Sequence, residues 1–290
     1  MKVVIFTDLD GTLLDHKTYS YDPARPALAL LKRLDIPLVI CTSKTSGEIE
    51  YLRQEIDNHD PFVSENGGGV FIPHGYFPFT AGHGGLAGLP ADSIEVDEGG
   101  KYDVIRLGAK YQDLRRAVGT LRERGYPIRG FGDMTVEEVS ETTGLSRELS
   151  ALAKNRDFDE PFVVEESVPV STRDLTGAIE ALGFRYTIGR LGHLMGSSDK
   201  GKAVTLLTEL YTLNFMERVF TIAVGDAPND IPMLRAVDHP VIVQRPDGSY
   251  NPDIAMEGLI RAEGVGPRGW DLAVGEVVDR IYGNARLSSL

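Results

Sequence analysis

The stretch FTDLDGTLLD, from Phe6 to Asp15, places two carboxylates directly behind an apolar run. Asp8 and Asp10 stand one residue apart, and the run before them, residues 3–6, has the composition of a buried strand. Carboxylates are rarely buried without a partner, so this pair indicates either a bound cation or a charged surface turn.

Further polar groups stand where the sequence predicts that strands end and helices begin. Ser43 and its neighbours Thr42 and Lys44 follow the apolar run 37–41, and the sequence GDAPND (residues 225–230) follows the apolar run 219–224. Lys200 comes just before a helical pattern that begins near Lys202. Ligands of open parallel sheets bind beyond the carboxyl ends of the strands, so we expect these groups to meet at one rim.

These residue types suit phosphoryl transfer. Mg²⁺ prefers hard oxygen ligands, and Asp8, Asp226 and a backbone carbonyl near Asp10 are the expected protein ligands. With the phosphate charge neutralised, an aspartate can attack as a nucleophile and form an aspartyl phosphate that water cleaves. Ser43 and Lys200 would bind the phosphoryl oxygens, while Asp10 would protonate the leaving oxygen and then deprotonate the water.

The elements that must position these groups form a repeating pattern. Short apolar runs alternate with helical patterns over the first seventy residues, and the same alternation returns between residues 202 and 243. Strands that alternate with helices are typical of a parallel sheet with crossover helices. The sequence therefore predicts an α/β fold with a doubly wound parallel-sheet core to which both ends of the chain contribute.

The middle of the chain has a different rhythm. Residues 102–107, 162–164 and 184–188 resemble strands, whereas residues 111–124 and 171–182 have helical spacing. This mixture predicts an inserted α+β cap domain. The expected division is a core of residues 1–83 and 197–290 with a cap of residues 84–196. The glycine-rich stretch 82–87 fits the loose pattern G-x-G-x-x-A but follows no strand, so it is interpreted as a hinge and not a dinucleotide site.

Composition limits the possible partners. Of the 290 residues, 42% are hydrophobic and 25% charged, as in ordinary globular proteins. The formal net charge of -13 and the lack of a basic block argue against nucleic acid and anionic membranes as partners. Cys41 is the single cysteine, which excludes an internal disulfide and a cysteine zinc site. We expect a cytoplasmic protein, because the apolar run near the N-terminus is too short for a signal peptide and no later apolar run approaches ~20 residues.

The segments DLDGT, TSKT, SSDKGKA and GDAPND, in this order, resemble the four motifs of the haloacid dehalogenase superfamily of phosphatases. The resemblance implies that Asp8 is the nucleophile and Asp10 the acid/base. It also implies that Asp226 binds the metal directly and that Asp230 more often acts through water, so the predicted metal set is Asp8, Asp10, Asp226 and Asp230. An insert placed after Ser43 and before Lys200 resembles the subfamily with a large α/β cap.

Other segments resemble one branch of that superfamily, the mannosyl-3-phosphoglycerate phosphatases. They are SENGGGVF at residues 64–71, IRGFGDMT at 128–135, GRLGHLMGSSDKGKA at 189–203 and GPRGW at 266–270. The sequence has Arg190-Leu191-Gly192 where the pattern of this branch has an arginine followed by an aromatic residue, so it departs from the branch at this point. The resemblance implies a Mg²⁺-dependent phosphatase that converts mannosyl-3-phosphoglycerate, a small phosphorylated substrate, to mannosylglycerate, a compatible solute.

A second set of residues is predicted to bind the substrate. Arg190 and His193 would contact the glycerate carboxylate or the sugar hydroxyls, because arginine donors form a planar fork that fits a carboxylate. Glycines in the SENGGGVF segment would let the backbone approach a ligand, although a loop that needs positive φ explains them as well. Ser43 could also cap the following helix. The full predicted set is Lys44, Asn66, Gly67, Gly68, Arg129, Arg190, His193 and Asn229.

Several other functions are compatible with parts of this pattern. A glucosyl-3-phosphoglycerate or hexose-phosphate phosphatase would use the same core motifs, and so would a phosphohexomutase that returns the phosphoryl group to a sugar. A non-catalytic sugar-phosphate binder would not need both Asp8 and Asp10. A glycosyltransferase with a DxD motif would leave GDAPND and TSKT without roles.

Overall fold

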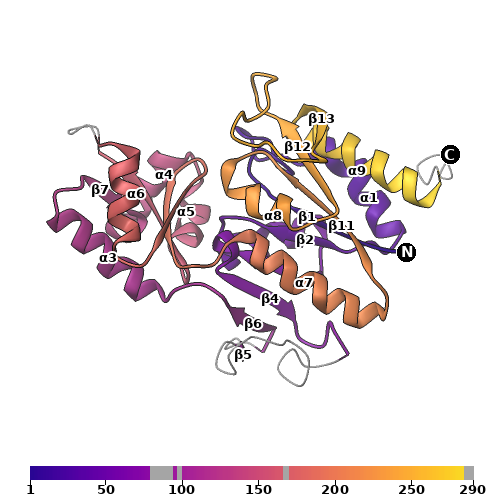
Figure 1. Ribbon diagram of the computed structural model, residues 1–290, viewed down its shortest axis with the longest axis horizontal. Helices are drawn as coiled ribbons and strands as arrows, with labels where there is room; N and C mark the ends of the chain where they lie inside the picture. The colour runs from indigo at the N-terminus through magenta and orange to yellow at the C-terminus, as the bar shows by residue number, and fades with distance from the viewer. Residues whose placement is uncertain (79–93, 97–99, 166–169, 284–290) are drawn as a thin grey trace.

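The computed structural model describes residues 1–78, 94–96, 100–165 and 170–283, which form two lobes (Figure 1). The larger lobe contains a nine-stranded sheet with the order β13-β12-β11-β1-β2-β3-β4-β6-β5. The strands from β13 to β3 are parallel, and β4, β6 and β5 are antiparallel. The strands are β1 Lys2–Thr7, β2 Leu38–Cys41, β3 Phe62–Ser64, β4 Gly69–Pro73, β5 Ile94–Val96, β6 Tyr102–Arg106, β11 Val219–Gly225, β12 His239–Gln244 and β13 Ile260–Val265.

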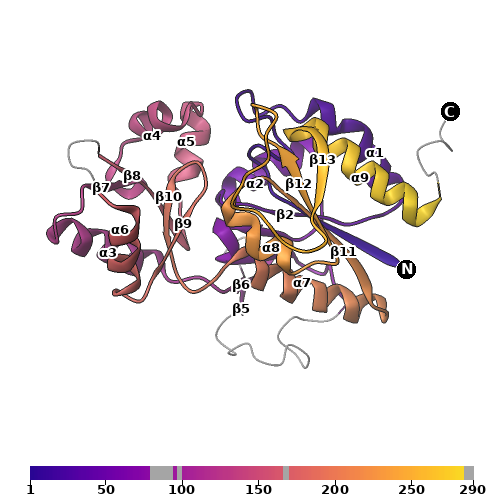
Figure 2. The ribbon, with the colours of Figure 1, turned by 45° about the horizontal axis from the view of Figure 1, so that its top comes forward.

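Helices cover both faces of this sheet. Successive side chains of a strand point to opposite faces, so Val3 and Ile5 of β1 pack in one hydrophobic cluster and Val4 and Phe6 pack in another. The first cluster includes residues of α1, α2 and α9, and the second includes residues of α7 and α8. In Figure 2, α1 and α9 lie together on one side and α7 lies on the other. The predicted doubly wound α/β core is confirmed. The helices are α1 Arg25–Arg33, α2 Ser46–Ile56, α7 Lys200–Phe215, α8 Ile231–Arg235 and α9 Gly266–Tyr282.

The smaller lobe is an α+β insert with a four-stranded antiparallel sheet of order β7-β8-β10-β9. Leucines of α3 and α6 pack with Phe162 and Leu194 of this sheet, and α4 and α5 enclose a separate cluster around Phe131. The elements are α3 Tyr111–Glu123, β7 Ile128–Gly130, α4 Val136–Thr143, α5 Arg147–Lys154, β8 Asp159–Val164, α6 Thr172–Glu180, β9 Arg185–Ile188 and β10 Gly192–Met195. The predicted inserted cap is confirmed. None of the helices in the ranges described above is long and apolar enough to cross a membrane.

One predicted strand lies in the other lobe. The pattern at residues 102–107 forms β6, but β6 pairs with β4 of the large sheet and not with the insert. Alternation identifies a half-buried strand without specifying its neighbour, which is why the assignment of this strand to the cap was wrong. The predicted boundary at residue 84 and the stretch 82–87 lie outside the described residues. We propose that the cap begins after Arg106.

Trp270 connects α9 to the end of β1. Its side chain is fully buried, and its Nε1 donates a hydrogen bond of 3.0 Å to Oγ1 of Thr7. Replacement of a buried tryptophan by alanine leaves a cavity and usually costs about 3–5 kcal/mol. We therefore expect Trp270→Ala to lower the free energy of unfolding by about this amount. Chemical denaturation followed by far-UV circular dichroism tests the expectation, and Leu213→Ala on the exposed side of α7 serves as control. Equal stability of the two variants would contradict it.

Candidate active site

The carboxyl ends of three neighbouring parallel strands bring the predicted groups together. In the large sheet β1 lies between β11 and β2. Asp8 directly follows β1, Asp226 directly follows β11, and Ser43 lies two residues beyond the end of β2. All three residues line one cleft between the lobes. The convergence expected from the sequence is therefore present in the fold.

Three carboxylates gather at the base of this cleft. Asp8, Asp226 and Asp230 each offer an oxygen atom within 4.8 Å of the other two. Burial raises the pKa of Asp8 to about 7, against the opposing charge of Lys200. Burial, together with Asp230 and Asp8, raises the pKa of Asp226 well above its usual range. Such crowding disfavours the charged forms unless a cation is present.

The donors of this cluster fit a divalent cation. Hard oxygen ligands of this kind are those that Mg²⁺ and similar ions prefer. In addition, Oδ1 of Asp10 is buried and has no hydrogen-bond partner in the part of the chain that the structure describes. Buried carboxylate oxygens normally have a partner. The free oxygen of Asp10, close to Asp8, Asp226 and Asp230, could therefore bind a cation or accept a hydrogen bond from a ligand.

Lys200 neutralises part of the cluster from below. It is the first residue of α7 and is fully buried, and its Nζ lies 2.7 Å from Oδ1 of Asp8 and 2.7 Å from Oδ1 of Asp230. Burial alone would lower the pKa of Lys200, but Asp230 and Asp8 raise it above the ordinary value. Lys200 is therefore a permanent cation at the base of the site.

Both carboxylate oxygens of Asp230 accept hydrogen bonds from neighbouring groups. Its Oδ1 accepts from Lys200, and its Oδ2 accepts the backbone N–H groups of Asp226 and Ala227, each at 3.0 Å. It is fully buried and does not line the cleft. In this position Asp230 orients the loop that carries Asp226, in addition to any contact with a metal.

Asp10 and Lys44 form an ion pair at the cleft. Nζ of Lys44 lies 3.0 Å from Oδ2 of Asp10, and Asp10 keeps 34% of its side chain exposed. The N-cap of α2 is Thr45 and not Ser43, because Oγ1 of Thr45 accepts the N–H of Glu48. Ser43 therefore does not cap α2. It lines the cleft.

The cap supplies the far side of the cleft through Arg190 and His193. Nη1 of Arg190 donates a 2.8 Å hydrogen bond to the hydroxyl of Tyr19 in the core. His193 is buried, and its Nδ1 lies 3.0 Å from both oxygens of Asp159. The second oxygen of Asp159 also accepts from Nδ2 of Asn66, at 2.7 Å.

This polar chain continues into the core. Oδ1 of Asn66 accepts from Nδ2 of Asn229 at 3.1 Å, so His193, Asp159, Asn66 and Asn229 form one connected path across the two lobes. Asn229 and His193 line the cleft, whereas Asn66 does not. Asn66, which was predicted to bind the substrate, thus connects Asp159 of the cap to Asn229 of the core.

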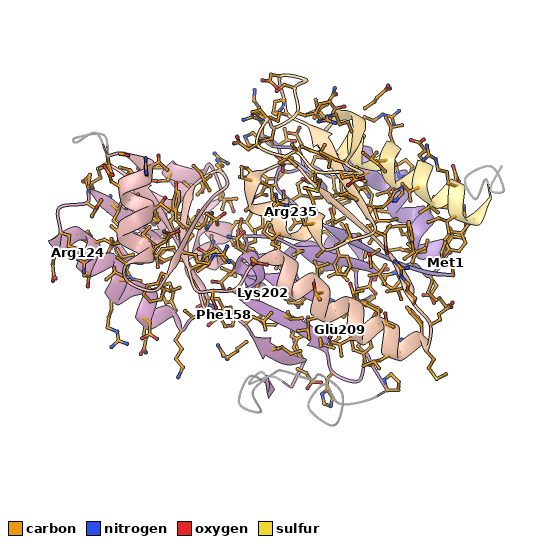
Figure 3. All side chains as sticks on the ribbon, in the orientation of Figure 1. Met1, Arg124, Phe158, Lys202, Glu209 and Arg235 are labelled. Carbon is orange, nitrogen blue, oxygen red and sulfur yellow. The ribbon has the colours of Figure 1, made fainter. Side chains whose placement is uncertain are left out.

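Three other predicted substrate residues do not reach the cleft. Arg129 forms an ion pair with Glu138 on the cap. A Cβ atom on Gly67 would lie 2.2 Å from the carbonyl oxygen of Asp199, and one on Gly68 would lie 2.2 Å from Cβ of Phe158. Figure 3 shows Phe158 at the junction of the lobes. In the structure these glycines permit close packing at that junction.

The sequence reasoning missed several residues that line the cleft. Arg156 enters from the cap between α5 and β8, and Tyr19, Arg245 and Asn251 enter from core loops. Each is a single polar or aromatic residue in a loop, with no neighbouring motif. Only the folding of distant segments against one another brings them to the site.

The sequence segments that form this site match a known protein family. A model of the haloacid dehalogenase-like hydrolases matches residues 5–76 and 193–247, which contain Asp8, Ser43, Lys200 and Asp226. The chain belongs to the haloacid dehalogenase-like hydrolase family, and it is a capped phosphatase of that family. The membership implied by the four motifs is confirmed.

Individual relatives cover nearly the whole chain. The glucosyl-3-phosphoglycerate/mannosyl-3-phosphoglycerate phosphatase of Methanococcoides burtonii is 48% identical over 97% of this chain and 98% of its own length. The mannosyl-3-phosphoglycerate phosphatase of Pyrococcus horikoshii is 37% identical over 83% of this chain and 90% of its own. A solved phosphatase of the superfamily from Bacteroides thetaiotaomicron has a TM-score of 0.62 at 16% identity, covering 97% of this chain and 96% of its own, and it shares the fold.

Gly68 distinguishes packing from ligand binding. Because a Cβ there would overlap Phe158, we expect Gly68→Ala to lower the free energy of unfolding by about 1–3 kcal/mol. Gly119→Ala in α3 is the matched control, because a Cβ at Gly119 meets no atom within 4 Å and alanine favours a helix by up to about 1 kcal/mol. Thermal and chemical unfolding of both variants measure the difference. A Gly68→Ala protein of unchanged stability but weakened substrate binding would instead support the ligand role.

Proposed function

We propose that this protein is a Mg²⁺-dependent phosphatase that hydrolyses mannosyl-3-phosphoglycerate or its glucosyl counterpart. One observation carries the proposal: the relative that is 48% identical over nearly the full length is named for both substrates. The site supports it, because a buried acidic cluster that fits a cation opens into a cleft lined by basic residues of both lobes. We name the mannosyl ester as the first substrate to test.

In the proposed first step, a carboxylate oxygen of Asp8 attacks the phosphorus atom and the bond from phosphorus to the glycerate oxygen breaks. The carboxyl group of Asp10 gives its proton to that leaving oxygen. In the second step Asp10 takes a proton from water, the water oxygen attacks the phosphorus, and the bond to Asp8 breaks. Free phosphate leaves and both aspartates return to their starting state.

The other core residues serve this sequence by charge and position. Ser43 donates a hydrogen bond to the phosphoryl group, and Lys200 holds Asp8 in place while it offsets the negative charge. Asp8 and Asp226, with Asp10 and Asp230 beside them, would hold Mg²⁺. When bound, the ion would neutralise phosphate charge and so allow a carboxylate to approach.

The remaining proposed contacts recognise the rest of the substrate. Lys44 and Asn229 border the cleft from the core, and Arg190 and His193 border it from the cap. Core groups act on the phosphoryl group, which all candidate substrates share. Discrimination among esters must therefore come from the lobe that covers the leaving group.

A phosphate-release screen with Mg²⁺ tests the proposal directly. We expect kcat/KM for mannosyl-3-phosphoglycerate and glucosyl-3-phosphoglycerate to exceed those for 3-phosphoglycerate, glucose 6-phosphate and p-nitrophenyl phosphate. Asp8→Asn should remove turnover on every substrate, because an amide cannot form the phosphoenzyme, and Asp10→Asn should lower kcat by about 10²–10⁴-fold.

Asp22→Asn on the exposed surface of the core is the control for these variants. It should leave phosphate release unchanged. A simple hexose phosphate as the best substrate would overturn the named substrate class but leave the phosphatase, whereas an active Asp8→Asn protein would overturn the covalent mechanism.

Removal of the metal gives an independent test. Because a ligand that binds only the folded state stabilises it, Mg²⁺ added to chelator-treated protein should raise Tm as well as restore turnover. Asp226→Asn removes a charge from the proposed ligand set and should abolish the rise in Tm, whereas Asp22→Asn should retain it. Full activity in excess chelator would contradict the proposed requirement for Mg²⁺.

A further inference from the structure

Arg156 is a buried cation without a carboxylate partner. Only 9% of this residue is exposed, and no carboxylate in the described ranges lies within ion-pair distance of it. Its Nε donates to the carbonyl oxygen of Ala153 at 2.9 Å, and its Nη1 donates to that of Ser43 at 2.8 Å. Both partners are neutral. Buried charges are normally paired, so this guanidinium suits an anionic ligand.

The segment around Arg156 is held rigidly in place. The carboxylate of Glu65, from the core, accepts the backbone N–H groups of Asp157, Phe158 and Asp159 at 2.8–3.2 Å. The guanidinium carbon of Arg156 also lies 5.8 Å from the ring centroid of Phe131. A side chain fixed in this way loses little conformational entropy when it binds a ligand.

The carboxylates near Arg156 are engaged elsewhere. Burial opposes the positive charge, but Asp159 and Glu65 raise the pKa of Arg156 from beyond ion-pair distance. Asp159 is bonded to His193 and Asn66, and Glu65 is bonded to backbone N–H groups. These acids favour the charged form of Arg156 but do not form a salt bridge with its guanidinium group. Arg156 lines the cleft, where a guanidinium group can bind a carboxylate.

The position of Arg156 relative to the reacting centre identifies the anion. The hydrogen bond to the carbonyl of Ser43 places the guanidinium next to the residue whose hydroxyl is proposed to bind the phosphoryl group. In a glycosyl-3-phosphoglycerate the phosphate is attached through C3, and C2 alone separates C3 from the carboxylate carbon. A second anion that close to the phosphate is present in glycosyl phosphoglycerates and absent from hexose phosphates.

We propose that Arg156 binds the glycerate carboxylate of the substrate and makes the site selective for glycosyl phosphoglycerates over sugar phosphates that lack a carboxylate. This inference rests on the proposed function and deepens it. It also divides the work between the arginines. Arg190 lies at the exposed rim against Tyr19, where the sugar would emerge, whereas Arg156 lies inside beside Ser43.

A matched pair of substrates isolates the carboxylate. Glucosyl-3-phosphoglycerate is compared with 2-O-glucosylglycerol 3-phosphate, in which a hydroxymethyl group replaces the carboxylate. We expect the unaltered enzyme to prefer the acid by about 100-fold in kcat/KM, as for a lost buried charge pair. Arg156→Gln should remove this preference by slowing the acid about 100-fold while it changes the alcohol less than about threefold.

Further measurements separate the other roles of this arginine. Inhibition by inorganic phosphate should be unchanged in Arg156→Gln, and a large loss would show that Arg156 binds the transferred phosphoryl group instead. Arg190→Gln should lower kcat/KM for the acid and for the alcohol by equal factors. Should Arg156→Gln fail to fold, Arg156→Lys retains the charge without the planar fork, and it is expected to keep part of the preference for the acid.

The outcomes distinguish this inference from the proposed function. An unaltered enzyme that hydrolyses neither sugar phosphoglycerate would overturn the proposed function, and the inference with it, before any variant is made. An unaltered enzyme that accepts the alcohol as well as the acid would overturn only the inference. Equal losses on both substrates in a folded Arg156→Gln protein would likewise show that Arg156 supports structure and does not recognise the carboxylate.

Discussion

The site depends on one buried ammonium group that is shared by two buried carboxylates. Nζ of Lys200 contacts Asp8 and Asp230, and all three side chains are almost entirely removed from water. Removing one partner of such a group leaves an uncompensated buried charge, which typically costs about 3–5 kcal/mol. The end of β1, the start of α7 and the loop after β11 must therefore stay in register with one another. This requirement explains why Trp270 anchors Thr7 and why Asp230 uses its second oxygen to hold the backbone of Asp226 and Ala227.

A second constraint operates where the chain crosses between the lobes. Gly67, Gly68 and Gly108 lie so close to Asp199 or Phe158 that a Cβ on any of them would overlap a neighbouring atom. Glu65 and Asn66 adopt positive φ and bond to the segment that begins β8. The SENGGG sequence is thus used for a tight junction. The cap residues Arg156 and His193 are held relative to the core by these contacts, so the position of the cap and the shape of the cleft are linked.

The electrostatics of the chain are local. The molecule carries a formal net charge of -13, yet the cleft contains Lys44, Arg156, Arg190 and Arg245. An overall negative protein repels an anionic substrate at long range, but this repulsion is screened beyond a Debye length of ~8 Å at physiological ionic strength. Within the cleft the nearby cations determine the binding. A net negative charge on the whole chain is therefore compatible with a cleft in which basic side chains gather.

The sequence by itself determined which residues gather at the base of the site. Asp8, Ser43 and Asp226 follow apolar runs that form adjacent parallel strands, and the order of strands and helices requires those ends to meet. Local periodicity also identified the inserted cap. Only the tertiary structure decided which sheet β6 joins, that Gly67 and Gly68 pack at the junction, and that Arg156 lies beside Ser43. The reason is physical: a strand pattern reports burial on one face but not the neighbouring strand, and an isolated arginine in a loop has no periodicity to reveal its partner. Contacts between residues 43 and 156 exist only once both lobes have folded and docked.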